Sequence, residues 1–182
     1  STRNVIRTPA NNKLRMEDKR GEEHIKLSTE YGGKTQLNLG HNVNAQRELR
    51  GEGAELRTDK WVSIRGGAGV FISADKQPSA GDRMLAMEEA IAQLENALGI
   101  AKSLASAAES AQALPSDTGN QQTLNDALKE LAQPGIVLNA PQGVSISSPQ
   151  AVRLSSGSAC VGIVSQQNTD ISALKRFTVA AG

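Results

Sequence analysis

The amino-acid sequence predicts a mainly β chain that assembles with two copies of itself as a β-prism and carries one α-helical hairpin insertion. Three observations predict this fold class. Pairs of apolar residues recur every eight positions at 54–72 and again at 136–159 of the 182-residue chain. Aromatic residues make up only 2% of the chain, so the large side chains that fill a compact core are scarce. Between the two repeats the apolar spacing changes to that of a helix.

The eight-residue repeats, or octads, predict short strands with one apolar face. Within each pair the two apolar residues are separated by one position, which is the alternation of a half-buried strand. Polar or glycine-rich stretches such as 57–60 and 65–69 lie between the pairs and suit turns. A structural axial core is therefore expected from Val62, Ile64, Val70, Ile72, Ile136, Leu138, Val144, Ile146, Val152 and Leu154.

An octad provides one strand and one turn, which cannot enclose an apolar interior within a single chain. Three chains that each place one octad along one side of a triangular prism would close the cross-section, with the apolar pairs at the axis. The backbone hydrogen bonds would then form between chains and leave no exposed strand edges. An intramolecular meander of regular hairpins is the alternative. Upstream of residue 54 the pattern is looser, in the pairs Leu14/Met16, Ile25/Leu27 and Leu37/Leu39, so that all of 12–74 is predicted to form short strands.

Residues 84–108 predict a helix with a heptad seam, because apolar residues alternate at spacings of three and four. The seam consists of Met84, Met87, Ile91, Leu94, Leu98, Ala101, Ala105 and Ala108. Ser79 and Asp82 fit an N-terminal capping box, and Pro115 marks the end of the helix. A second helix is expected at 121–132, after a turn at 114–120. The pattern is compatible with a hairpin that packs on the prism and with one that projects from it.

Composition excludes several function classes. The chain has 20 Lys and Arg against 19 Asp and Glu, for a net charge of +1, which predicts no nucleic-acid partner. The single cysteine excludes an internal disulfide framework, and no apolar run has the length of a membrane span. The start at Ser-Thr-Arg, without Met, is expected of a fragment of a longer polypeptide.

The candidate cofactor and metal sites all have simpler structural explanations. The glycines of 65–70 predict turns rather than a phosphate loop, because a strand and not a helix follows. His24 and His41 have no neighbouring His or Cys, and His24 is expected to face outward because Ile25 has core parity. Cys160 falls in the apolar column opened by Ile136 and is expected to be a small buried thiol. No cofactor and no metal are expected.

The carboxylate pairs offer no catalytic site. Glu22–Glu23 and Glu88–Glu89 are adjacent in sequence, and adjacent side chains diverge on a strand or helix. We therefore expect solvated carboxylates and a protein that is not an enzyme.

Three stretches carry a family resemblance: "LSTEYGGKTQLNLGH" (27–41), "RGEGAELRTDKWVSIRGGAGVFISAD" (50–75) and "LAQPGIVLNAPQGVSISSPQAVRLSSG" (131–157). They resemble the C-terminal part of VgrG, the spike protein family of type VI secretion systems. The resemblance implies a homotrimer whose C-terminal part is a triple-stranded β-helix, a β-prism needle like that of contractile phage tails. Such a needle punctures the target envelope, carries effector proteins and is tipped by a PAAR-repeat protein. It contacts the secretion tube through a hub that is missing here, and contacts the target membrane mechanically.

The resemblance also suggests a division of the chain. Residues 1–50 would be the end of a phage-spike-like β region, 51–78 an octad-repeat β-helix, 79–133 the helical insertion, and 134–182 octad-repeat β-helix truncated at its C-terminus. It implies secretion without a signal peptide through the type VI machine, from the bacterial cytoplasm to the target cell. The alternatives are a phage-type tailspike polysaccharide depolymerase and a trimeric adhesin stalk. A depolymerase groove usually combines aromatic and acidic side chains, and aromatic residues are scarce here.

Overall fold

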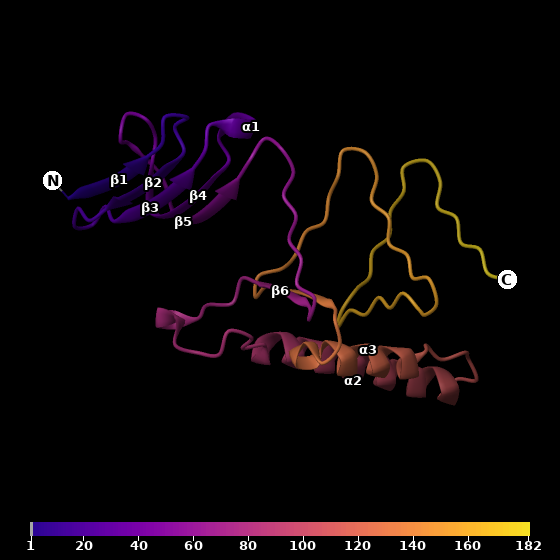
Figure 1. The fold of residues 1–182 in the computed structure, drawn as a ribbon. Coiled ribbons are helices and arrows are strands. Elements are labelled where there is room, and N and C mark those ends of the chain that lie inside the picture. The colour runs from indigo at the N-terminus through magenta and orange to yellow at the C-terminus, as the bar shows by residue number, and fades with distance from the viewer. Residues whose placement is uncertain (1) are drawn as a thin grey trace. The chain divides into compact units, whose positions relative to one another are not determined.

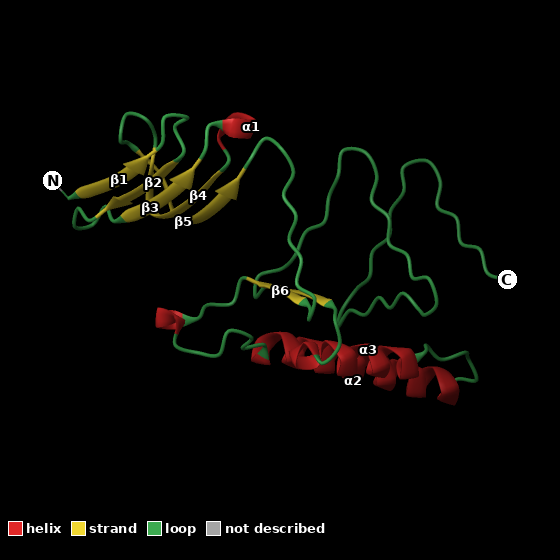
Figure 2. Ribbon diagram, in the orientation of Figure 1, coloured by secondary structure: helices red, strands yellow, loops and turns green. Residues whose placement is uncertain are grey.

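A computed structural model describes residues 2–182 and divides into two units, Ser1–Ile64 and Arg65–Gly182 (Figure 1). The first unit is an antiparallel sheet, and the second contains two strands, a helical hairpin and a long irregular segment (Figure 2). Over residues 2–182, no helix combines the length and the apolarity needed to cross a membrane. Each unit is described on its own.

The first unit is a five-stranded meander in which each strand pairs antiparallel with the next. Its elements are β1 (Arg3–Arg7), β2 (Lys13–Glu17), β3 (His24–Ser28), the single turn α1 (Tyr31–Lys34), β4 (Gln36–Val43) and β5 (Leu49–Arg57). Because β5 pairs with β4 along its whole length, the boundary expected at residue 51 falls inside a strand. Ala54 and Leu56, which we assigned to the octads, belong to this sheet.

The strand β4 passes very close to the loop before β3. At Gly40 the backbone has a φ of 91°, which L side chains rarely adopt. A Cβ atom at Gly40 would lie 2.4 Å from the carbonyl oxygen of Glu23. Glycine is therefore required here for the chain to hold β4 against β3.

The second unit begins with a parallel strand pair formed by the residues that flank the helical insertion. Its elements are β6 (Val70–Ser73), the 3₁₀ turn η1 (Pro78–Ala80), α2 (Glu88–Ser110), α3 (Thr118–Leu128), the 3₁₀ turn η2 (Lys129–Leu131) and β7 (Ile136–Asn139). In this pair Val70 lies beside Ile136, and Ile72 beside Leu138, so the apolar pairs of the two octad stretches are in register. We call residues 70–139 the hairpin module.

The hairpin packs on the strand pair, which answers the question that the sequence left open. Met87 and Ala90 are almost fully buried against Val137, and Phe71 and Leu128 border the same cluster. Phe71 and Val137 are neighbours in the register, so one face of β6–β7 is covered by the hairpin. This cluster is the hydrophobic core of the unit.

The helix boundaries differ from those expected. α2 begins at Glu88 with Met87 at the N-cap and no side-chain cap, so the predicted start at Met84 and the capping box at Ser79 and Asp82 are wrong. Ser79 instead lies in η1 with a φ of 56°. The first turn of α2 carries two glutamates, which suit the positive end of a helix.

α3 is three residues longer at its start than predicted, because Asp117 provides an N-cap. The Asp117 side chain accepts a hydrogen bond from the backbone N–H of Asn120 at 2.9 Å. The same contacts, led by this backbone bond, lower the pKa of the Asp117 carboxyl. Further along α3, the amide of the buried Asn125 donates to the carbonyl oxygen of Leu94 at 2.7 Å and ties α3 to α2.

The chain after β7 has a different character. Residues 140–182, all of which the structure describes, contain neither helix nor strand. Figure 1 shows this segment leaving β7, arching away from the helices, returning to them and arching away again toward the C-terminus. We call residues 140–182 the octad segment.

Candidate assembly surfaces

The sheet of the first unit leaves an apolar face uncovered. The strand registers align its side chains in two rows across the five strands. The rows are Ile6, Leu14, Leu27, Leu37 and Leu56, and Met16, Ile25, Leu39 and Ala54. Leu27 is 55% exposed and Leu56 60% exposed, although leucines in a sheet normally face a core. An apolar face of this extent on an isolated chain marks an interaction surface.

The opposite face of the same sheet is polar and buried. Glu17 is 7% exposed and accepts hydrogen bonds from the Thr2 hydroxyl at 2.5 Å and from the Arg3 guanidinium at 2.8 Å. The bond from Thr2 and then the bond and charge of Arg3 lower the pKa of Glu17 to about 2. Asn38 and Arg50 likewise hold the Glu55 carboxylate, and the Arg50 bonds lower its pKa. The hydrogen bonds of these two carboxylates are therefore satisfied within the chain, whereas the apolar face of the sheet remains uncovered.

His24 lies on the polar face and is 6% exposed, so the prediction that it faces outward is wrong. Its parity was inferred from Ile25, which is 43% exposed because the apolar face is the uncovered one. Nδ1 of His24 lies 2.9 Å from the carbonyl oxygen of Glu22, and Nε2 is buried without a hydrogen-bond partner. His41 Nδ1 is 3.9 Å from a Glu52 oxygen. Over residues 2–182 no group of three potential metal-ligating side chains occurs.

The octad residues of the hairpin module face away from the hairpin. Ile72, Ile136 and Leu138 are 51%, 67% and 52% exposed, on the side of β6–β7 opposite Phe71 and Val137. Val70 is half-buried. These are four of the ten predicted axial residues, and the strand register places them side by side across the two strands.

The octad segment repeats this exposure without strand pairing. Val144, Ile146, Val152 and Leu154 are 58%, 66%, 54% and 69% exposed. Upstream, Val62 and Ile64 are 53% and 69% exposed and lie outside any strand. Apolar residues exposed in this number and at regular spacing mark an interaction surface.

The eight-residue repeat gains one extra residue after Leu154. The prediction that Cys160 lies in the apolar column is therefore wrong. The next alternating apolar pair is Val161 and Ile163, nine rather than eight residues after Val152 and Leu154. The spacing then returns to eight at Ile171. Cys160 therefore has the opposite parity from the apolar column, and it is exposed rather than buried.

The helical seam is covered from within the chain, except at its start. Leu98, Ala101 and Ala105 are buried and Met87 is 1% exposed, whereas Met84 lies before the helix and is 90% exposed. The remaining seam residues are half-buried, namely Ile91, Leu94 and Ala108.

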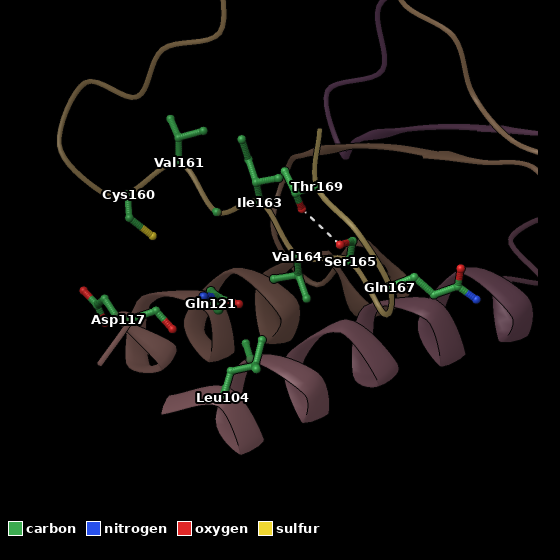
Figure 3. A pocket seen from close by; sticks show the side chains of 13 residues that line it. Leu104, Asp117, Gln121, Cys160, Val161, Ile163, Val164, Ser165, Gln167 and Thr169 are labelled. Atoms are coloured by element: carbon green, nitrogen blue, oxygen red, sulfur yellow. Dashed lines mark hydrogen bonds between the residues drawn. The ribbon is translucent and has the colours of Figure 1, made fainter. Parts of the chain in front are cut away.

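An open cavity separates the hairpin from the returning octad segment. It has a volume of about 630 Å³ and is lined from the helices by Leu94, Leu98 and Leu124. A second cavity of about 440 Å³ continues toward Leu104. Figure 3 shows Cys160 and Val164 directed toward the helices, and Val161 and Ile163 directed away from them.

The remaining candidates have structural roles. Gly69 donates its N–H to the carbonyl of Gly66 at 3.0 Å, so the glycine-rich stretch forms a turn before β6. Glu22 pairs with Lys19, and Glu88 pairs with Arg83 at 3.0 Å.

Comparisons with known proteins give a consistent result. Residues 3–108 match the family described as "Putative type VI secretion system Rhs element Vgr", and residues 123–182 match a family described as an uncharacterized protein conserved in bacteria. The type VI secretion system spike proteins VgrG2a and VgrG2b of Pseudomonas aeruginosa are 34% and 33% identical to it over 94% of this chain. The chain spans only 22% and 18% of those proteins.

Two solved structures are also similar over the whole chain. One is described as the VgrG spike from the type 6 secretion system, and the other as the Tle1 effector bound to that spike. Both are 67% identical with a TM-score of 0.97, and the chain covers 69% and 56% of their lengths.

Proposed function

Because the chain belongs to the VgrG family of type VI secretion spike proteins, we propose that it forms one third of a homotrimeric β-prism needle that pierces target envelopes. The observation that carries this proposal is the set of regularly spaced, exposed apolar residues in the octad segment. Ile146 and Leu154, for example, are 66% and 69% exposed in a stretch without strands.

Three copies together would cover the apolar residues and pair the backbone groups that one chain leaves exposed. The octad segment contains no strand of its own, so other copies would provide the strand partners for its backbone N–H and C=O groups. Each octad would cover one side of a triangular prism, so three chains would close the interior around the apolar columns. The apolar face of β1–β5 would be covered by the same association.

The proposed role is mechanical rather than catalytic. In such a prism the ladders of the octad segment would join different chains, whereas β6 and β7 pair within one chain, so local unfolding of the octad segment must break interchain hydrogen bonds at several levels together. This coupling resists axial load. No residue is assigned to catalysis, and no cofactor or metal is required for the role.

Effector transport is the second part of the proposal. One similar structure contains the Tle1 effector bound to a VgrG spike. We extend this to an effector and a PAAR-repeat tip protein carried by the complete protein, which would join the secretion tube through its hub. The needle would be secreted through the type VI machine and would enter the target cell.

The test is the absolute mass of the purified chain by light scattering coupled to gel filtration. A species of three times the chain mass that elutes early for its mass is expected. A compact species of one chain mass would overturn the prism for this chain, because the octads would then have to pair within it.

A further inference from the structure

The hairpin of the second unit meets its own chain at two separate levels. Near the start of α2, Ala90 packs in the core with Val137 of β7. Near the middle of α2, Ala101 lines the cavity that faces Cys160 and Val164. A Cβ atom at Gly162 would lie 3.7 Å from the Gln121 side chain, so this second level is in near contact with α3.

The chain between these levels turns away from the helices. Figure 1 shows residues after β7 arching away from the hairpin before the chain returns to it. Counted from Ile136, the arch contains the apolar pairs of the octads 144–151 and 152–159, and the chain has returned to the helices at Ser156, which lines the cavity, before the next apolar pair at Val161 and Ile163. A chain that places one octad on each of three sides comes back to its first side at the fourth octad, as observed.

The distance between the two levels leaves room for two further strands. Eleven residues separate Ala90 from Ala101, which is about 16 Å along a helix that rises 1.5 Å per residue. Three strand spacings of about 4.8 Å amount to about 14 Å. Two strand positions therefore fit between the strand β7 at the level of Ala90 and the returning segment at the level of Ala101.

The cavity opens onto the part of α2 between these two levels, and Ser156, Cys160 and Val164 of the returning segment also line it. Leu94 and Leu98 of α2 and Leu124 of α3 line it, and Leu124 is 57% exposed. Ala97 on the same surface is small enough to allow close approach of a strand. A surface that is apolar, open and of this spacing matches the outer side of two octad strands.

We propose that each hairpin seats octad 144–151 of one partner copy and octad 152–159 of the other, between its own β7 and its own residues 160–164. This rests on the trimeric needle proposed above. In a threefold prism, four octads follow one another along each side. The first and the fourth belong to one chain, and the second and the third belong to the two other chains. Each hairpin therefore clamps all three chains.

The outward positions of the seated octads fit this surface. They have the opposite parity from the apolar columns and are Ser145, Ser147, Arg153 and Ser155. Three of the four are serines, which allow a strand to lie close to the alanine and leucine side chains of α2. The long stem of Arg153 can lie along the apolar groove while its charge reaches water.

Disulfide trapping tests the seating. In a C160S background, Ala97→Cys is combined in turn with cysteine at each of the four outward positions. Mild oxidation followed by a denaturing gel is expected to convert at least one pair largely to covalent dimers and trimers, because the partners lie on different chains. The control pair is Gln121→Cys with Gly162→Cys, which lie in one chain and are expected to give a covalent monomer.

The outcomes separate this inference from the proposed function. One outcome would overturn the seating but not the proposed needle. In it, the protein has three chain masses before oxidation, the control pair gives a covalent monomer, and none of the four test pairs gives an interchain product. A monomeric mass before oxidation would overturn the needle and the seating together. Interchain product from the control pair would also overturn the seating, because the fourth octad would then belong to another copy.

Discussion

The hairpin module and the octad segment belong to one unit, yet they bury their apolar residues in opposite ways. The module buries Met87, Ala90 and Val137 inside one chain. The octad segment leaves Ile146 and Leu154 about two-thirds exposed. A helical period brings apolar residues of one chain onto one surface, where a second helix or a strand pair can cover them. An eight-residue strand period distributes them along residues 140–182, where the chain itself leaves them exposed.

The largest effect is expected from Ile146→Asp in the octad segment. Threefold symmetry would bury three carboxylates at one level of the axis, each of which costs several kcal/mol to desolvate. We expect complete loss of the trimer in light scattering, with the helical circular dichroism of the hairpin module retained. Ser148→Asp, at an exposed turn position, is the control and should remain trimeric. A heat-stable I146D trimer would exclude Ile146 from the axis.

The next largest effect is expected from Met87→Ala in the hairpin module. Met87 is 1% exposed, and removal of such a buried side chain lowers the free energy of unfolding by about 2–5 kcal/mol. Urea unfolding followed by helical circular dichroism measures this change. Met84→Ala is a matched control, because Met84 is 90% exposed and its loss should change the stability by less than about 0.5 kcal/mol. Equal effects of the two substitutions would contradict the intrachain core.

A smaller effect is expected from Asn125→Ala, which removes the bond between α3 and α2. The amide of Asn125 donates to the Leu94 carbonyl at 2.7 Å from a buried position. Its loss should lower the free energy of unfolding by about 1–2 kcal/mol. Asn96→Ala removes an exposed amide from α2 and serves as the control in the same urea experiment. If N125A were as stable as N96A, the interhelical bond would not contribute to the module.

The most restricted effect is expected from Glu17→Gln in the sheet of the first unit. The Thr2 and Arg3 bonds lower the pKa of Glu17 to about 2, below its ordinary value of about 4.3. Because the folded pKa is depressed, the stabilisation is present above pH 4.3 and is lost as the pH falls toward 2. The stability difference between the wild type and E17Q should therefore shrink over this window. A difference that stays constant from pH 5 to pH 2 would contradict the pairing, and E23Q, which removes an exposed carboxylate, is the control.

Much of the local structure could be predicted from periodicity, because each pattern specifies one kind of element. The heptad spacing predicted α2 with a start four residues too early, since Met84 continues the spacing without joining the helix. The octad pairs at Val70 and Ile136 predicted β6 and β7, although not that they pair with each other. The parallel pairing of two strands that flank an insertion cannot be predicted from periodicity, because neither strand's own sequence indicates its partner.

The errors concern which side of a strand is covered. His24 was placed outward because apolar neighbours normally face a core, but in this sheet the polar side is the buried one. Cys160 lies outside the apolar column because the repeat contains one extra residue after Leu154, which reverses the parity of the positions that follow. Alternation identifies the two sides of a strand, but it does not show which of the two sides is covered.

The pairing of β6 with β7 has a consequence for how such a protein can change. β6 ends at Ser73, and the chain forms its next strand, β7, from Ile136. The two strands lie side by side with their apolar positions aligned. The 62 residues between them therefore leave the alignment of the apolar positions in β6 and β7 unchanged. We therefore expect that a hairpin of another length, or a folded domain with closely spaced ends, can be grafted between Ser73 and Ile136 while β6 and β7 remain paired in the same register.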